Sequence, residues 1–225
     1  MRTVIFDLDG TLADTSGDLI AAANACFVGL GHGRLLDPKA DAATALRGGR
    51  AMLTLGFSRL EGTFDADILE AAITAQYSVL LRHYDDRIAE HTTLYPGAIA
   101  AIDMLAGKGF AIGICTNKPA ALAEKLMRAL GVRDRFGALV GADTLPVRKP
   151  DPAPFFAAVQ QAGGSASRAL LVGDTLTDHT TARAAGVPSV LVTFGPGGED
   201  LRDLGPDAFL DDYADLPDLA ERLLR

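Results

Sequence analysis

Residues 1–15 read MRTVIFDLDGTLADT, and this stretch decides the fold. The apolar run Thr3–Phe6 is continuous rather than alternating, which is typical of a strand buried on both faces of a parallel sheet. Asp7, Leu8, Asp9 and Gly10 follow it directly. Because ligands bind at the carboxyl ends of the strands in open α/β sheets, two carboxylates at this strand end indicate a candidate site.

The chain beyond the first strand alternates between strand and helix patterns from about residue 93 onward. Four further continuous apolar runs predict buried strands at Phe110–Cys115, Ala138–Val140, Ala169–Val172 and Ser189–Val192. Helical patterns occupy Gly97–Ala106, Ala120–Leu130, Pro152–Ala162 and Thr177–Ala185, several of them closed by a glycine at Gly107, Gly131, Gly163 or Gly186. This alternation predicts an α/β fold with a doubly wound, Rossmann-like parallel sheet.

Residues 16–92 break this rhythm, because they contain helical patterns and no convincing strand. The patterns cover Asp18–Leu30, Ala40–Leu46, Ala51–Leu60 and Asp67–Ala89. We therefore predict two domains, an α/β core formed by residues 1–15 and 93–225 and an all-helical cap inserted at residues 16–92. GLGHG at residues 29–33 follows a helix and lacks nucleotide-loop spacing, so it predicts a helix end. GPGGEDLRDLGPD at residues 195–207 predicts a loop with a short helix.

Composition excludes several classes of protein. A chain of 225 residues that is 48% apolar can bury a substantial core. Its net charge of -8 argues against nucleic acid or an anionic membrane as the main partner. The two cysteines, Cys26 and Cys115, are far apart and predict thiols in a reducing compartment. The N-terminus has no signal-peptide pattern, and we expect a cytoplasmic protein, either a monomer or a homodimer.

Polar residues that suit phosphate chemistry follow the other predicted strands. Thr116, Asn117 and Lys118 come after the second strand, Asp174 and Asp178 after the fourth, and Lys149 lies in the loop beyond the third. Carboxylates from two strand ends make an all-oxygen site that best suits Mg²⁺.

The partners of a bound phosphate are expected among the same residues. We expect Thr116 and the Asn117 amide to bind phosphoryl oxygens, and Lys149 to bridge phosphate and nucleophile. Taken singly, a Lys-Pro or Gly-Asp pair is usually a solvated loop or turn, so the prediction depends on their joint order at strand ends.

This order of motifs resembles the haloacid dehalogenase superfamily, and within it the capped phosphatases similar to phosphoglycolate phosphatase. DLDGTLADT at residues 7–15 resembles the first motif and Thr116 the second. Lys149 in RKPDPAPF resembles the third, and GDTLTD at residues 173–178 the fourth. The resemblance spans nearly the whole chain, including the position of the helical cap.

The resemblance implies a Mg²⁺-dependent phosphatase acting on a small phosphorylated metabolite, with 2-phosphoglycolate as the first candidate. It implies that Asp7 attacks phosphorus and becomes an aspartyl phosphate, while Asp9 serves as general acid and then general base. It places the metal on the Asp7 carboxylate, the Asp9 backbone carbonyl and Asp174, with Asp178 nearby or in the outer shell.

Arg47 and Arg50 flank two glycines in the cap and are candidates for contact with an anionic substrate. A solvated surface is the alternative. The RGGR segment departs from the glycine-containing cap segment expected for phosphoglycolate-type enzymes, which leaves the substrate open.

Several other functions compete with the phosphatase. A phosphosugar mutase of the β-phosphoglucomutase type shares the nucleophile but returns the phosphoryl group to a sugar. Dehalogenation does not require the acid and the metal site, and a phosphonate-cleaving relative would need a cap amine, for which Lys39 is the only lysine. A non-catalytic phosphate-binding protein is the alternative of a different class.

Overall fold

The computed structural model describes residues 1–60, 65–195 and 201–225. The strands are β1 (Thr3–Phe6), β2 (Ala13–Asp14), β3 (Thr93–Leu94), β4 (Ala111–Cys115), β5 (Ala138–Val140), β6 (Ala169–Gly173), β7 (Ser189–Val192) and β8 (Ala208–Leu210). The helices are α1 (Ser16–Gly29), α2 (Ala42–Ala45), α3 (Gly49–Ser58), α4 (Ala66–Asp86), α5 (Ala98–Gly107), α6 (Ala120–Ala129), α7 (Ala153–Gln161), α8 (Leu176–Ala185) and α9 (Leu216–Leu223). Short 3-10 turns occur at Arg133–Arg135, Ala166–Arg168, Leu201–Leu204 and Tyr213–Asp215.

Six strands form one parallel sheet in the order β5-β4-β1-β6-β7-β8, which confirms the predicted fold class. From β1 the chain builds outward to β4 and β5, and it then returns to β6 and builds in the opposite direction. The order therefore reverses between β1 and β6, and such a switch point is where open α/β sheets bind ligands. Phe6 of β1 is in register with Val172 of β6, so both strands end at the same level.

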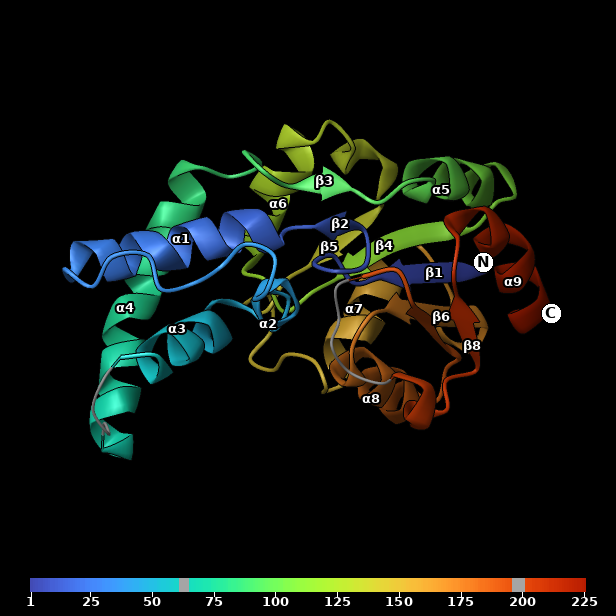
Figure 1. The fold of residues 1–225 in the computed structure, drawn as a ribbon. Helices are drawn as coiled ribbons and strands as arrows, with labels where there is room; N and C mark the ends of the chain where they lie inside the picture. The colour runs from blue at the N-terminus through green and yellow to red at the C-terminus, as the bar shows by residue number, and fades with distance from the viewer. Residues whose placement is uncertain (61–64, 196–200) are drawn as a thin grey trace. The chain divides into compact units, whose positions relative to one another are not determined.

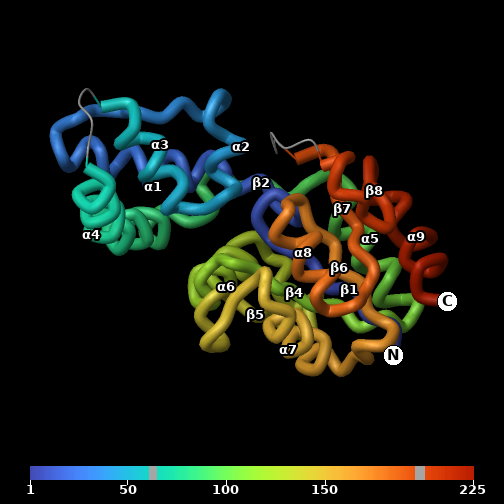
Figure 2. Tube along the Cα trace, turned by 90° about the horizontal axis from the view of Figure 1, so that it is seen from below, coloured from blue at the N-terminus to red at the C-terminus, as the bar shows by residue number. Residues whose placement is uncertain are grey.

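Helices cover both faces of this sheet (Figures 1 and 2). Helices α7 and α8 pack together against β1, β4, β5, β6 and β7, while α5 packs against β4 and α9. The central strands are buried throughout, with Ile5, Leu171 and Phe155 in one apolar cluster. Burial on both faces explains why these strands read as continuous apolar runs.

Two compact units divide the chain. One contains residues 15–93 and the other contains residues 1–14 and 94–195 with the C-terminal segment. In the first unit α1 packs against α2, α3 and α4, and Phe27 meets Phe57 edge to face. A bidentate ion pair between Asp41 and Arg59 joins the segment before α2 to the end of α3. The carboxylate of Asp18 accepts hydrogen bonds from the backbone of His91 and from Thr92, which ties α1 to the end of the unit.

The structure corrects several details of the predicted elements. Strand β8 and helix α9 were not predicted, and β8, at three residues, is too short to show a clear period. Gly107 is the last residue of α5 rather than its terminator, and Gly109, at φ 78°, takes the left-handed conformation instead. The predicted 195–207 loop contains the 3-10 turn at Leu201–Leu204, but residues 196–200 lie outside the described chain.

Two further features concern the helices and the cysteines. Among residues 1–60, 65–195 and 201–225, the helices lack the combination of length and apolar character needed to cross a bilayer. Cys26 and Cys115 are buried, free cysteines.

Candidate active site

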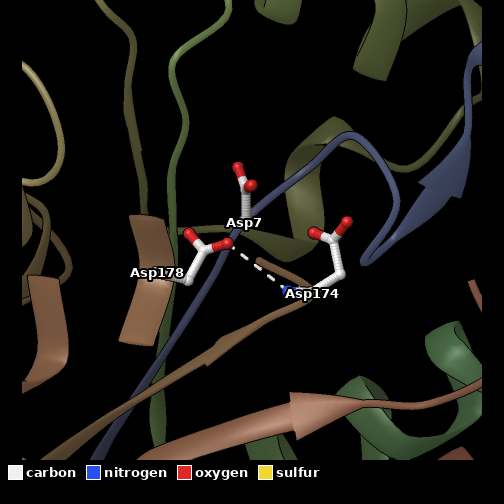
Figure 3. Close-up of side chains that lie close together, drawn as sticks. All are labelled: Asp7, Asp174 and Asp178. Carbon is white, nitrogen blue, oxygen red and sulfur yellow. Dashed lines mark hydrogen bonds between the residues drawn. The ribbon is translucent and has the colours of Figure 1, made fainter. Parts of the chain in front are cut away.

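Asp7, Asp174 and Asp178 gather at the carboxyl ends of β1 and β6 (Figure 3). One carboxylate oxygen from each lies within 4.8 Å of the others. Asp7 is the first residue after β1, and its backbone N–H continues the sheet by donating to the carbonyl of Val172. The parallel register of the two central strands thus brings together side chains that are more than 160 residues apart in sequence.

Asp7 is buried and held through a single oxygen. Its Oδ1 accepts hydrogen bonds from the backbone N–H of Leu8 at 2.7 Å and lies 3.0 Å from Nζ of Lys149. Within the described residues, the contacts of the Asp7 carboxylate are made through Oδ1 and not through the second oxygen, Oδ2. A turn follows, in which Gly10 adopts φ 81° and donates its N–H to the carbonyl of Ala13.

Lys149 is the buried cation of the cluster. Its Nζ lies 2.6 Å from Oδ1 of Asp178 as well as 3.0 Å from Asp7, and its side chain is 2% exposed. Burial alone would lower the pKa of Lys149, but the carboxylates of Asp178 and Asp7 outweigh it and hold the pKa above its usual range. Lys149 therefore stays charged and bridges the strand end of Asp7 to the first turn of α8.

Asp178 uses both of its oxygens within the protein. Its Oδ1 pairs with Lys149, and its Oδ2 accepts from the hydroxyl of Thr175 at 2.6 Å, in the capping box that starts α8. A Cβ on Gly173 would lie 2.3 Å from Cβ of Asp178, so only glycine permits this approach. Asp178 thus orients Lys149, and this geometry favours the outer-shell role over direct metal contact.

Asp174 follows β6, and its carboxylate is hydrogen-bonded to Thr11 of the first motif. Its Oδ1 accepts from the hydroxyl of Thr11 at 2.8 Å, and the Thr11 carbonyl accepts from Tyr213 Oη at 2.7 Å. Tyr213 in turn packs on Phe194, which packs on Tyr95. Neither Thr11 nor this aromatic group was singled out from the sequence.

Burial raises the pKa values of the carboxyl groups of Asp7 and Asp174. Burial, only partly offset by Lys149 and reinforced by Asp178 and Asp9, raises the pKa of Asp7 from 3.8 to about 7. Burial and the charges of Asp178 and Asp7 likewise raise the pKa of Asp174 well above 3.8. Such displaced carboxyl pKa values are typical of functional sites, and a bound cation would counter them.

Thr116 and Asn117 lie where β4 ends. The Thr116 hydroxyl accepts from the backbone N–H of Lys118 at 3.1 Å, which orients its own hydrogen toward another acceptor. The Asn117 amide donates to the carbonyl of Lys149 at 3.0 Å. This bond ties the second and third motif loops together, and direct phosphate contact by Asn117 stays a prediction.

Asp9 has a partner that the sequence reading did not assign. Nζ of Lys118 lies 2.8 Å from Oδ1 of Asp9, and the two side chains are 5% and 15% exposed. In the sequence, Lys118 was noted only as a residue that follows the second predicted strand, and no role was assigned to it. Its position directly after Thr116 and Asn117 was the one available signal.

Arg47 and Arg50 lie in the compact unit that contains residues 15–93. Arg47 is exposed between α2 and α3, while Arg50 pairs with Glu70 and its guanidinium lies 5.9 Å from the ring centre of Tyr77. Gly48 adopts φ 95°, and a Cβ on Gly49 would lie 2.8 Å from Leu80 Cδ2. Backbone conformation explains Gly48 and packing explains Gly49, and substrate contact by Arg47 and Arg50 stays a prediction.

Comparison with known proteins agrees with this geometry. Residues 1–186 match a family model described as haloacid dehalogenase-like hydrolase. A phosphoglycolate phosphatase from Rhodospirillum rubrum is 39% identical over 96% of this chain and 90% of its own length. One from Agrobacterium fabrum is 37% identical over 98% of this chain and 93% of its own. In fold, a crystal structure of a predicted phosphoglycolate phosphatase from Haemophilus somnus superposes with a TM-score of 0.82 at 24% identity, covering 97% of each chain.

Proposed function

We propose, from the premise that this chain belongs to the haloacid dehalogenase-like hydrolase family, that it is a Mg²⁺-dependent phosphatase for small phosphate monoesters, with 2-phosphoglycolate as the first candidate substrate. The chain is a phosphoric monoester hydrolase of this family. The observation that carries the mechanism is the buried Asp7 carboxylate, held through Oδ1 beside Lys149. The candidate substrate follows the names of relatives that are similar over nearly the full chain.

The residues divide the reaction into two balanced halves. Oδ2 of Asp7 forms a bond to phosphorus in line with the ester oxygen, and the P–O bond to the leaving alcohol breaks. Asp9 supplies the proton that turns the departing alkoxide into an alcohol. In the second half Asp9 takes a proton from water, which attacks the aspartyl phosphate and releases phosphate and the Asp7 carboxylate. Asp9 thus recovers its proton once in each cycle.

Lys149 provides fixed positive charge beside the transferring group. The ammonium of Lys149 contacts Oδ1 of Asp7, and the attacking atom, Oδ2, belongs to the same carboxylate. Because Asp178 holds the ammonium from the other side at 2.6 Å, the charge needs no rearrangement during the reaction. Thr116 completes the group by offering a hydroxyl at the neighbouring strand end.

The donor set fits Mg²⁺. Asp7 and Asp174 present carboxylate oxygens within 4.8 Å of each other, and the family resemblance adds the backbone carbonyl of Asp9 as a third oxygen ligand. Asp178 completes the acidic cluster but uses both oxygens elsewhere. A Mg²⁺ held by Asp7, the Asp9 carbonyl and Asp174 would supply charge that offsets carboxylate repulsion and polarises the phosphoryl group.

The affinity for Mg²⁺ is expected to depend on pH through Asp7. Its pKa of about 7 means that the folded protein keeps a proton that the unfolded chain, with a value near 3.8, has already lost. The stability that this proton gives the metal-free fold is complete below pH 3.8 and is lost as pH rises from there to about 7. Because the metal binds the carboxylate forms of both Asp7 and Asp174, and the pKa of each is raised, its affinity should fall by at least about tenfold per pH unit below 7.

Thermal unfolding with and without Mg²⁺ at pH 5.5, 6.5, 7.5 and 8.5 measures this effect. The Mg²⁺-induced rise in Tm should be small at the lowest pH and level off at the highest. Asp7→Asn should show a weaker rise with a shallower dependence on pH, because only Asp174 then titrates among the two carboxylate ligands. An equal Mg²⁺ effect at all four pH values in the unsubstituted protein would contradict a ligand role for Asp7.

A panel of phosphate esters tests the proposed function. Phosphate release from 2-phosphoglycolate, sugar phosphates, nucleotides and pyrophosphate should be measured with Mg²⁺ and with excess chelator. Release of phosphate that requires Mg²⁺, fastest with 2-phosphoglycolate, is the expected result. Conversion of a sugar phosphate into its isomer without phosphate release would identify a mutase, and no turnover of any ester would leave a phosphate-binding protein.

The remaining assignments stay predictions with their own tests. A cytoplasmic location fits the sequence and is checked by fractionating cells that produce the protein. The state in solution, monomer or homodimer, is read from light scattering. Arg47→Ala and Arg50→Ala should raise KM for an anionic substrate if either side chain reaches it.

A further inference from the structure

We propose that Lys118 is a positioning residue that fixes the carboxyl group of Asp9 for proton transfer. This rests on the proposed function, because it assigns a partner to the acid/base of that reaction. Nζ of Lys118 lies 2.8 Å from Oδ1 of Asp9. The ammonium therefore contacts one carboxylate oxygen of the residue that the proposed function assigns to proton transfer.

Lys118 is itself held firmly by its backbone. Its N–H donates to the Thr116 hydroxyl at 3.1 Å, and its carbonyl accepts from the N–H of Ala142 at 3.0 Å. The preceding Asn117 is bonded to the carbonyl of Lys149 at 3.0 Å. The ammonium therefore extends from a loop that is anchored to the neighbouring strand ends, which is the support that a precise catalytic group requires.

Asp9, by contrast, lies in a tight turn outside any helix of the core. It forms an isolated bridge with Ala13, and the next residue, Gly10, has φ 81°. A charge-assisted hydrogen bond from a buried ammonium favours one rotamer of the Asp9 side chain, and small displacements of a catalytic group are costly in rate.

The burial of the pair argues for positioning over stability. With side chains 5% and 15% exposed, both charges lose most of their hydration. A buried ion pair is weak support for stability, because desolvation offsets the attraction. Lys149 forms ion pairs with Asp7 and Asp178, whereas Lys118 forms its ion pair with Asp9. The two lysines therefore divide the work, one beside the nucleophile and one beside the acid.

A leaving-group comparison with Lys118→Met tests this role. An alkyl leaving group needs a proton from Asp9, whereas p-nitrophenolate leaves without one. The kcat/KM of Lys118→Met should therefore fall about 100-fold with 2-phosphoglycolate and with ethylene glycol monophosphate. It should change only a few-fold with p-nitrophenyl phosphate. Ethylene glycol monophosphate is included because it has a hydroxyl in place of the carboxylate.

The double variant Asp9→Asn/Lys118→Met isolates the path of the effect. If Lys118 acts through Asp9, the double variant should match Asp9→Asn alone with each ester. The exposed Lys125→Met on α6 is the matched control and should keep full activity. Lys118→Gln is measured in parallel, and thermal unfolding of every variant separates a lost fold from a lost function.

The possible results distinguish a failure of the Lys118 role from a failure of the proposed phosphatase function. An equal loss with all three esters, or a further loss in the Asp9→Asn background, overturns the positioning role. A loss confined to 2-phosphoglycolate overturns it too, because Lys118 would then contact the substrate carboxylate. An unsubstituted protein without phosphatase activity removes the proposed function, and with it the role of Lys118.

Discussion

Asp7→Asn is expected to lower Mg²⁺-dependent phosphate release by about 10⁴-fold or more, because an amide cannot form the phosphorylated intermediate. The loss should appear in kcat, since the residues around the phosphate are unchanged. The fold should persist. Burial raises the pKa of Asp7 to about 7, so the fold disfavours its charge at pH 8, and a neutral amide of the same shape leaves the metal-free protein at least as stable.

The control for Asp7→Asn is the same change at an exposed position. Asp134→Asn, in the 3-10 turn before β5, should keep full activity. Thermal unfolding without metal at pH 8 should give Asp7→Asn a Tm equal to or above that of the unsubstituted protein. Activity within tenfold of the original would contradict the nucleophile assignment.

Lys149→Met is expected to lower kcat/KM by about 10³-fold, because it removes the fixed charge beside the transferring phosphoryl group. It should also lower the free energy of unfolding by about 3 kcal/mol at pH 8, since Asp7 and Asp178 are left facing each other with no cation between them. The stability loss should shrink near pH 5.5, where Asp7 takes up a proton.

Two further variants sharpen the Lys149 result. Lys149→Arg should not restore activity, because the planar guanidinium is larger and cannot place one compact charge between two carboxylates in a site that is 2% exposed. Lys125→Met again serves as the control for loss of a lysine. Steady-state kinetics and urea unfolding at pH 5.5 and 8 provide the measurements. Full activity in Lys149→Arg, or equal stability loss at both pH values, would contradict this account.

Most of the core was predictable because its strands are buried on both faces. Thr3–Phe6, Ala138–Val140 and Ser189–Val192 have the same bounds in the structure as in the sequence reading. Because parallel strands end at the same edge of a sheet, the residues that follow β1, β5 and β6 were expected to meet there. Asp7, Lys149, Asp174 and Asp178 do meet there.

The missed features depend on contacts that no local pattern records. Thr11 reaches Asp174 across 163 positions of sequence, and Lys118 reaches Asp9 across 109. A threonine in a turn and a lysine in a loop are ordinary residues until the fold places them. The packing of Gly49 against Leu80 is likewise a tertiary contact that the sequence does not show, and substrate contact by Arg47 and Arg50 stays a prediction.

The most direct test of the central claim is to find where the phosphoryl group resides during turnover. The protein is mixed with 2-phosphoglycolate and Mg²⁺, quenched in acid within one turnover, cleaved with trypsin and analysed by mass spectrometry. The account predicts the mass of one phosphoryl group on the Thr3–Arg34 peptide, with fragmentation placing it on Asp7 and Asp7→Asn abolishing it. Phosphoryl transfer to any other residue, or steady turnover with no labelled peptide at any quench time, would contradict it.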